Sequence, residues 1–242
     1  MWFFAGLLAL SVHAAPQSFD HEYKAWSALL GEYQNAEGLV AYKKLKSSGD
    51  LAPILSTLES VSYAQYNKWS DNQKKAFLIN SYNAFTVKLI LDHYPVASIK
   101  KIGSWFKKPW SIKFFKLLDG KIQSLDPIEH EWLRPKYKDY RIHAAVNCAS
   151  KSCPPLRHEA FVGSKLDAQL DEQMKLWLAD ESRNNLSDKK KIKISKIFDW
   201  YKSDFESWGG GILKVIEKHS GQSLSEPKIT FLEYDWSLND QG

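Results

Sequence analysis

The sequence has very little sulfur. Its 242 residues include two methionines and two cysteines, and both cysteines, Cys148 and Cys153, lie in the short segment 141–156. So few cysteines exclude a disulfide-rich scaffold. Two thiols in one segment with a histidine, His143, indicate instead a single disulfide, a metal site or a nucleophile.

Several other signals are missing. No apolar run after residue 12 is long enough to span a bilayer, so we expect no transmembrane anchor. The chain has no glycine-rich phosphate loop and no nucleic-acid recognition motif. Its formal charge is +5, from 33 basic and 28 acidic side chains, and the lysines are mostly spread out. We expect no nucleic-acid partner and no cofactor, and we take the partner to be an unknown small molecule or peptide-like ligand.

The N-terminus resembles a secretory signal. Residues 2–12 are apolar or small, and the segment Val12-His13-Ala14 fits the small-x-small cleavage rule. This pattern predicts a signal peptide over 1–14 and a mature chain that begins at Ala15 and is periplasmic or secreted. No Lys or Arg follows Met1, which is unusual for a signal peptide, and a buried N-terminal helix is the alternative.

The remaining chain, 15–242, is long enough for a single domain with a sizeable core. Ten tryptophans, eleven tyrosines and twelve phenylalanines argue against disorder. Apolar spacing predicts helices at 21–33, 51–60, 71–93, 126–134, 165–178, 197–208 and 212–219, a hairpin of 112–118 with 121–125, and strands at 141–146, 191–195 and 228–234. We therefore expect an α+β fold, mainly helical, with a small and mostly antiparallel sheet.

The helix over 71–93 has the clearest signals. Ser70 and Gln73 form a capping-box pattern before it, and Pro95 follows its end. Asn80 and Asn83 lie on one otherwise apolar face, where an unpaired buried amide would cost roughly 1–3 kcal/mol. These amides therefore either tie down a neighbouring loop, which we favour, or contact a ligand.

Two segments contain candidate chemical groups. The helix predicted to open at Asp126 carries Glu129, His130 and Arg134, where His130 and Arg134 are neighbours at i,i+4. The strand predicted at 141–146 carries His143 and leads into a turn with Cys148 and Cys153. Because Pro154 disfavours helical geometry at the preceding residue, a thiolate at Cys153 would need activation by a histidine or a cation.

These segments together resemble the DUF547 family, a domain of unassigned function. The similarity is carried by 76–84, 125–130, 133–134, 141–143 and 147–155, and by the later segments 197–201 and 234–239. The resemblance implies a single domain of this type, here an exported bacterial-type member. It marks positions in the sequence and implies no particular reaction.

Three functions fit these residues. The first is a thiol-dependent hydrolase or acyl transferase, in which Cys148 or Cys153 is the nucleophile, His143 the base and Glu129 an orienting carboxylate. The binding residues would be Asn80, Asn83, His130, Arg134, Asn147 and Ser152. The alternative is a non-catalytic ligand-binding or structural module with a Cys148–Cys153 disulfide. The third, a metal site, is disfavoured, because His143, Cys148, Cys153 and His158 match no common zinc spacing.

These assignments make a spatial prediction. The helix with Glu129 and His130, the segment with His143 and the cysteine turn should converge in one pocket beside Asn80 and Asn83. Only a short connection, 135–140, separates the helix from His143, which allows the two to be neighbours. We expect His143 to approach a cysteine sulfur or Glu129, directly or through one water.

Overall fold

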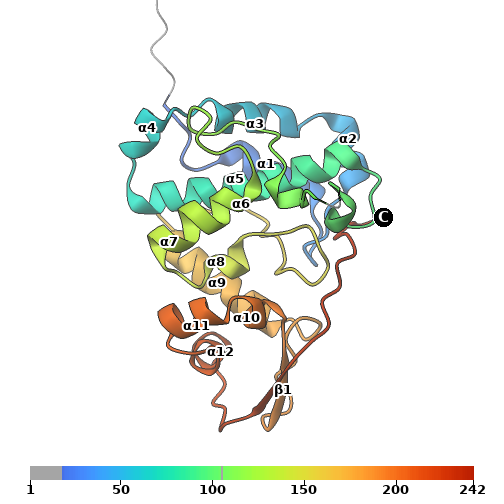
Figure 1. Cartoon of the computed structure of the whole chain (residues 1–242), viewed down its shortest axis with the longest axis vertical. Coiled ribbons are helices and arrows are strands. Elements are labelled where there is room, and N and C mark those ends of the chain that lie inside the picture. Colours follow the sequence, from blue (N-terminus) through green and yellow to red (C-terminus); the bar gives the residue numbers. More distant parts are fainter. Residues whose placement is uncertain (1–17, 105) are drawn as a thin grey trace, which may run out of the picture.

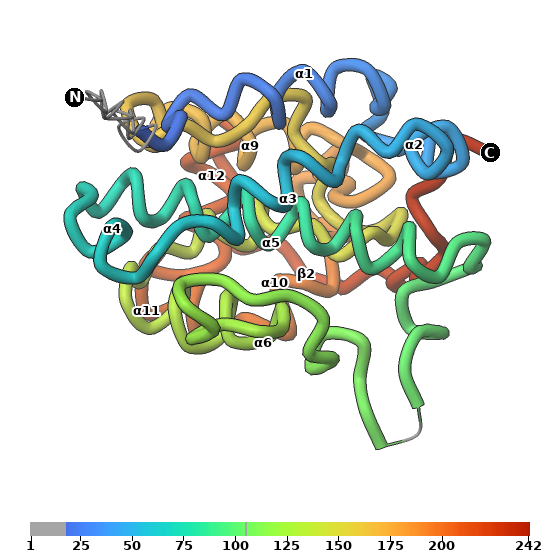
Figure 2. The backbone as a smooth tube through the Cα atoms, turned by 90° about the horizontal axis from the view of Figure 1, so that it is seen from above, coloured from blue at the N-terminus to red at the C-terminus, as the bar shows by residue number. Residues whose placement is uncertain are grey.

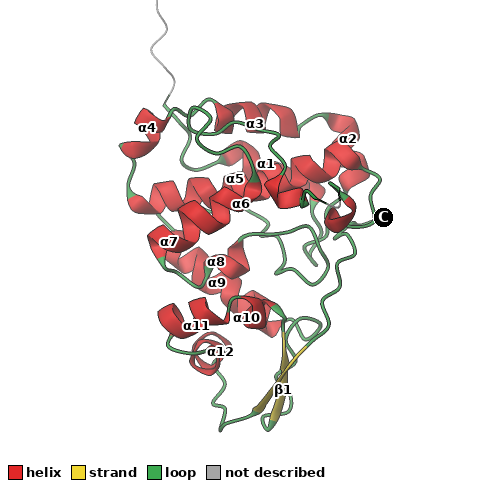
Figure 3. Cartoon of the chain, viewed as in Figure 1, coloured by secondary structure: helices red, strands yellow, loops and turns green. Residues whose placement is uncertain are grey.

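The computed structural model describes residues 18–104 and 106–242, so the predicted signal peptide, 1–14, lies outside the described residues. Helices dominate the described chain (Figure 3). They are α1 Lys24–Tyr33, α2 Tyr42–Ser48, α3 Leu51–Glu59, α4 Tyr63–Asn67, α5 Asp71–His93, α6 Leu125–Pro127, α7 Arg134–Tyr137, α8 Ile142–Ala145, α9 Leu166–Ala179, α10 Ile197–Trp200, α11 Lys202–Gly209 and α12 Ile212–Ser220. Single turns η1 Ile99–Lys101 and η2 Pro109–Ser111, the π-helix η3 Ile128–Leu133, and strands β1 Lys191–Ile194 and β2 Lys228–Phe231 complete the elements. No helix in the described ranges is long and apolar enough to cross a membrane.

Helix α5 lies at the centre of the larger part of the molecule. Its predicted capping box is present: the Gln73 N–H donates to Ser70 Oγ at 3.2 Å, and the Ser70 N–H donates to Gln73 Oε1 at 2.9 Å. The helix runs between α3 and α6, both of which it contacts (Figure 2). It is buried on every side from Lys75 to Val87. A helix covered all round is typical of the interior of a protein of this size.

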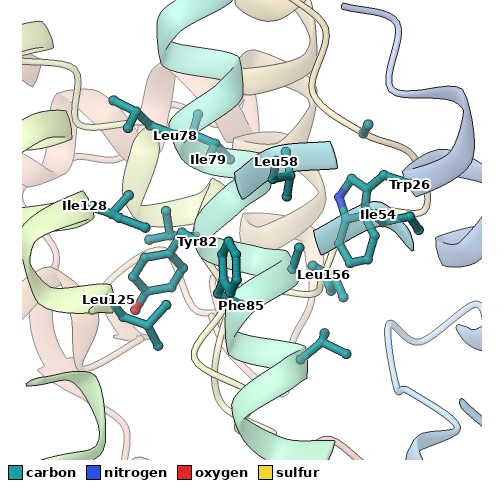
Figure 4. Close-up of a cluster of buried hydrophobic side chains, with 14 of the residues drawn as sticks. Trp26, Ile54, Leu58, Leu78, Ile79, Tyr82, Phe85, Leu125, Ile128 and Leu156 are labelled. Carbon is teal, nitrogen blue, oxygen red and sulfur yellow. The ribbon is translucent and has the colours of Figure 1, made fainter. Parts of the chain in front are cut away.

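The first hydrophobic cluster surrounds α5. Leu78, Tyr82 and Phe85 of this helix lie between Leu125 and Ile128 on one side and Leu58 and Trp26 on the other (Figure 4). Complete burial of one such side chain contributes about 1.5–3 kcal/mol. The sequence-distant segments 125–128 and 51–59 are therefore fixed against the same helix.

A second cluster fills the C-terminal part of the molecule. Trp177 of α9 stacks on Phe198 of α10, with ring centroids 4.8 Å apart, and Phe205 of α11 lies 4.5 Å from Phe198. Helices α10, α11 and α12 and the two strands form the lower part of the view in Figure 1. Helix α8 joins the two clusters, because Ala144 packs in the second and Ala145 in the first.

The sheet differs from the prediction. Strands β1 and β2 pair in parallel, with Lys191 opposite Lys228 and Ile194 opposite Phe231, so a mostly antiparallel sheet was wrong. The predicted hairpin over 112–125 is reduced to one antiparallel bridge between Leu117 and Ile122. Because helices α10 to α12 connect the two strands, the chain returns to the same end of the sheet and the pairing is parallel.

The segment that carries His143 is also different. It forms helix α8, where the Val146 N–H donates to the carbonyl oxygen of Ile142 at 3.0 Å, and not the predicted strand. All four residues of α8 are buried. A short apolar run buried on every side has no periodicity that separates a strand from a helical turn.

The helix with Glu129 begins one residue earlier than predicted and widens in its middle. Ser124 is the N-cap residue of α6, which starts at Leu125. Further along, the Arg134 N–H donates to the carbonyl oxygen of Glu129, five residues back, which is the π-helical pattern of η3. Pro135 has no N–H to donate and its ring would clash with a preceding turn of normal pitch, so the local widening lets the helix continue into α7.

Candidate functional site

A pocket of about 420 Å³ brings together many of the predicted residues. Its walls come from α5, η3, α8, the cysteine turn, α10 and the segment 234–236. The lining residues are Tyr82, Lys108, Trp110, Asp126, Glu129, His130, His143, Val146, Cys148, Cys153, Ile197, Trp200, Tyr201, Tyr234 and Trp236. Glu129, His130, His143, Cys148 and Cys153 therefore share one cavity.

The two cysteines form a thiol pair on one wall. Their sulfur atoms are 3.0 Å apart and both thiols are free. The Cys148 N–H also donates to Cys153 Sγ at 3.0 Å. The hydroxyl oxygens of Ser150 and Tyr234 both lie 3.2 Å from Cys148 Sγ. Cys153 is 2% exposed, and Cys148 is the more accessible of the two.

These contacts give the two thiols different acidities. The hydrogen bond from Cys153, aided by Ser150 and Tyr234, lowers the pKa of Cys148 to about 7 against the opposing effect of burial. Burial raises the pKa of Cys153 well above its ordinary value, and the neighbouring Cys148 adds to the increase. Cys148 is therefore the thiol that carries a substantial thiolate fraction at neutral pH.

His143 is held by an aspartate. Its Nε2 lies 2.9 Å from Asp204 Oδ2, and its ring stacks on Tyr201 with centroids 3.9 Å apart. Arg134 donates to both oxygens of Asp204, from Nε at 2.7 Å and from Nη2 at 2.9 Å. Burial alone would raise the pKa of Asp204, but the bonds from His143 and Arg134 hold that pKa well below its usual range. Asp204 is therefore a carboxylate that fixes the His143 ring.

The hydrogen-bond partner of His143 in the structure differs from the partners predicted from the sequence. The carboxylate on His143 is Asp204, from α11, while Glu129 lines the pocket elsewhere. Within the described chain His143 makes no direct hydrogen bond to Glu129 or to either sulfur. Its Nδ1 is buried without a hydrogen-bond partner among the same residues. The imidazole and the Cys148 thiol thus line the same pocket with no hydrogen bond between them.

The two asparagines of α5 tie down loops. Asn83 donates from Nδ2 to the carbonyl of Ala145 at 2.9 Å and accepts from the Asn147 N–H at 2.8 Å. Asn80 pairs in the same way with the backbone of Phe161, at 2.7 and 3.0 Å. Neither lines the pocket, so the loop-holding interpretation is the one that fits.

The other predicted binding residues also act on the protein itself. Asn147 accepts from the Ala149 N–H and donates to the carbonyl of Pro154, both at 2.8 Å, which shapes the cysteine turn. Ser152 Oγ accepts from the Asp235 N–H at 2.8 Å and ties that turn to the C-terminal segment. Of the predicted binding set, His130 lines the pocket, where its Nδ1 lies 3.0 Å from Arg134 Nη1.

Several residues that build the site were not among those predicted from the sequence. Asp204 and Tyr201 position His143, and Tyr234 contacts Cys148. Trp200 and Trp236 line the same pocket. Four of these five residues lie in segments 197–201 and 234–239, which are part of the family resemblance. That resemblance is the sequence signal that could have identified them. Asp204 had no such signal.

The four residues considered as metal ligands do not all lie in one pocket. His158 lines a different pocket from His143 and the cysteines. Over 18–104 and 106–242 there is no group of three or more His, Cys, Asp or Glu side chains placed to hold a metal ion.

Comparisons with known proteins give a family match and nothing further. No curated protein and no solved structure matches the chain. The family match ends at residue 178, so part of the pocket lies outside it. That part includes Trp200, Tyr201, Tyr234 and Trp236. Residues 66–178, which contain α5, the Glu129 helix, His143 and both cysteines, match the model of the family described as "Protein of unknown function, DUF547".

Proposed function

We propose that the protein is a thiol-dependent enzyme, a hydrolase or an acyl transferase, with Cys148 as its nucleophile. The observation that carries the proposal is the pairing of two features in one pocket. One is an accessible thiol whose pKa is lowered to about 7, and the other is a histidine fixed by a buried carboxylate. Covalent acyl transfer requires a nucleophile whose pKa is close to the pH of the solution and a base that is held in a fixed orientation.

The proposed reaction has two steps. The Cys148 thiolate attacks the carbonyl carbon of an ester, amide or thioester, and a carbon–sulfur bond forms while the bond to the leaving group breaks. Protonated His143 gives its proton to the leaving group. In the second step water or another nucleophile attacks the thioester, His143 takes the proton, and Cys148 leaves as a thiolate. Because Asp204 holds Nε2, proton transfer runs through Nδ1 of His143.

The test is acylation of the protein by p-nitrophenyl acetate. Absorbance of the released nitrophenol and the intact mass of the protein measure the reaction. The wild type should gain one acetyl group at Cys148, and C148S should lose both signals. C153S keeps the proposed nucleophile and removes the thiol whose hydrogen bond lowers its pKa, so it should still be acylated at Cys148, but more slowly at neutral pH. Unchanged acylation and turnover in C148S would refute the proposal.

The role of Asp204 can be separated from that of the thiol. D204N removes the charge that stabilises the imidazolium, and we expect turnover to fall by roughly 10²–10⁴-fold, the range for a lost general base. The thiol should remain reactive toward iodoacetamide in this variant, since Cys148 has its own hydrogen-bond partners. Loss of both reactivities would indicate a structural effect.

The second candidate is a ligand-binding or structural module with a Cys148–Cys153 disulfide. The observation in its favour is the 3.0 Å separation of the sulfurs, which leaves a short movement to the bonded distance of about 2.05 Å. Intact mass with and without reductant distinguishes a disulfide from two thiols. A disulfide in the isolated protein, with no acylation after reduction, would favour this candidate.

We also propose that the protein acts in the periplasm or is secreted, on the basis of the apolar run at 2–12 and the Val12-His13-Ala14 pattern. N-terminal sequencing of the protein from fractionated cells tests this. A chain that begins at Ala15 in the exported fraction is the expected result, and an intact Met1 in the cytosol would overturn it.

A further inference from the structure

Glu129 is left without a role once Asp204 is seen to hold His143. Its side chain comes from the π-helix η3, is 6% exposed and lines the pocket. Among residues 18–104 and 106–242 it has no ion-pair partner, whereas the equally buried Asp204 is bound by Arg134 and His143. A buried carboxylate without a counter-ion is costly, so proteins seldom keep one unless something binds it.

Two cationic side chains in or beside the pocket, Lys108 and Arg134, form no ion pair with Glu129 in the described part of the chain. Both oxygens of Asp204 hold the Arg134 guanidinium. Lys108 lines the pocket too, and its charge acts on Asp126, whose pKa is raised by burial and lowered in part by Lys108. Glu129 does have a neutral polar partner, the phenol of Tyr201: burial, the charge of this carboxylate and a hydrogen bond between the two groups raise the pKa of Tyr201.

Aromatic rings form a wall of the same pocket. Trp200 lies 4.7 Å from Tyr234 and 5.7 Å from Trp236, and Tyr234 lies 4.6 Å from Trp236, measured between ring centroids. Trp110 extends this wall, 5.8 Å from Trp236. Lys100 Nζ already lies 4.9 Å from the centre of the Trp236 ring. Such rings attract cations to their faces and bury the alkyl groups around a charge.

We propose that the pocket binds a substrate with a positively charged alkylammonium group, which Glu129 pairs with and the wall of Trp110, Trp200, Tyr234 and Trp236 encloses. The ammonium group would define the substrate class of the proposed enzyme. The reaction at Cys148 rests on the proposed function, whereas binding of the cation does not. The acyl group reaches Cys148 while the ammonium group occupies the part of the pocket next to Glu129. The substrate supplies the counter-ion that Glu129 lacks among the described side chains.

The test measures binding and needs no turnover. Full-length wild-type protein is titrated with choline and with its neutral isostere 3,3-dimethyl-1-butanol, by calorimetry and by tryptophan fluorescence. We expect choline to bind at least tenfold more tightly than the alcohol. E129Q should remove that preference and leave the affinity for the alcohol unchanged. The matched control is E131Q, which removes an exposed acid from the same π-helix and should keep the preference.

Two further measurements keep the outcome decisive. If E129Q does not fold, as judged by circular dichroism, W200L provides the second variant, since Trp200 is 45% exposed, and it should weaken choline binding at least threefold. Equal affinity of the wild type for the two probes, or no choline binding in the millimolar range, would overturn the proposal. C148S should bind choline normally, so a failure of the proposed chemistry is distinguishable from a failure of cation binding.

Discussion

Cys148 and Cys153 differ in the hydrogen bonds that their sulfur atoms make. Cys148 has the Cys153 thiol and two hydroxyl groups as partners, which favour a thiolate, while Cys153 is buried and receives a backbone N–H. Burial raises the pKa of Tyr234, with the charges of the two thiols adding to it, so its hydroxyl stays protonated as a donor. Selective reactivity at one sulfur follows from this difference.

We therefore expect iodoacetamide to modify Cys148 with a rate that rises with pH and is half-maximal near pH 7, the pKa of its thiol. Cys153 should stay unmodified while the protein is folded. Y234F should raise the midpoint by roughly half to one unit, because one hydrogen bond to the thiolate contributes about 1 kcal/mol. Alkylation followed by peptide mass spectrometry measures this.

S152A is the matched control, since Ser152 Oγ contacts Asp235 and not Cys148. A midpoint near 8.5, the ordinary value of a cysteine, in the wild type would contradict the assignment of Cys148 as the activated thiol.

At the scale of the elements, a charged cluster joins α5, α8 and α9. Lys75 of α5 pairs with Asp139, and both side chains are largely buried. Asp139 also binds Arg141, at 2.8 Å, which reaches Asp167 at 2.8 Å and Asp171 at 3.0 Å on α9. This network fixes the start of α8 and so the position of His143 in the pocket.

Asp139 gives the fold a defined acid sensitivity. Burial acts to raise its pKa, but the bonds from Arg141 and Lys75 lower it to about 2, below the value of about 3.9 in an unfolded chain. The unfolded state therefore binds the proton more readily, so this stability is present above pH 4 and is lost as pH falls toward 2. The shift corresponds to about 2.6 kcal/mol.

D139N should lower the free energy of unfolding by about 3–5 kcal/mol at pH 7, because Lys75 is left buried and unpaired. Its stability should also change less than that of the wild type between pH 4 and pH 2.5. Urea unfolding at several pH values measures both. D92N is the control, since Asp92 forms a partly exposed i,i+4 pair with Lys88 and should change stability by less than about 0.5 kcal/mol. Equal losses in the two variants would contradict the role of the network.

At the scale of the whole molecule, the C-terminal segment connects the two hydrophobic clusters. It returns from β2 to the end of the molecule that carries α2 (Figure 1). There the Tyr42 hydroxyl donates to Asn239 Oδ1 at 2.8 Å, and the Tyr94 hydroxyl donates to Asp240 Oδ2 at 2.7 Å. The segment contributes Leu238 to the cluster around α5 and, on its way, Tyr234 and Trp236 to the pocket.

We expect this continuity to give one cooperative unfolding transition, which a single domain would show. Tryptophan fluorescence and far-UV circular dichroism should report the same midpoint. N239A, which removes the buried bond to Tyr42, should shift both signals together by about 1 kcal/mol. Two separate transitions, or stable half-sized fragments on limited proteolysis, would contradict the single domain.

Features whose causes are local can be predicted from the sequence. The long helix begins after Ser70 and ends at His93 as predicted, because its capping box and its apolar face are written within a few neighbouring residues. The gathering of Glu129, His130, His143 and the cysteines in one pocket was also foreseen, since short connections separate these segments and buried polar groups tend to cluster.

Which groups meet inside that pocket depends on how distant segments pack against one another. Asp204 lies 61 residues after His143, and nothing in its local sequence distinguishes it from other aspartates. The helical form of α8 and the parallel pairing of β1 with β2 depend in the same way on what covers them. Hydrogen-bond partners and strand direction are set by the packing of distant segments, while a helix start is set by neighbouring ones.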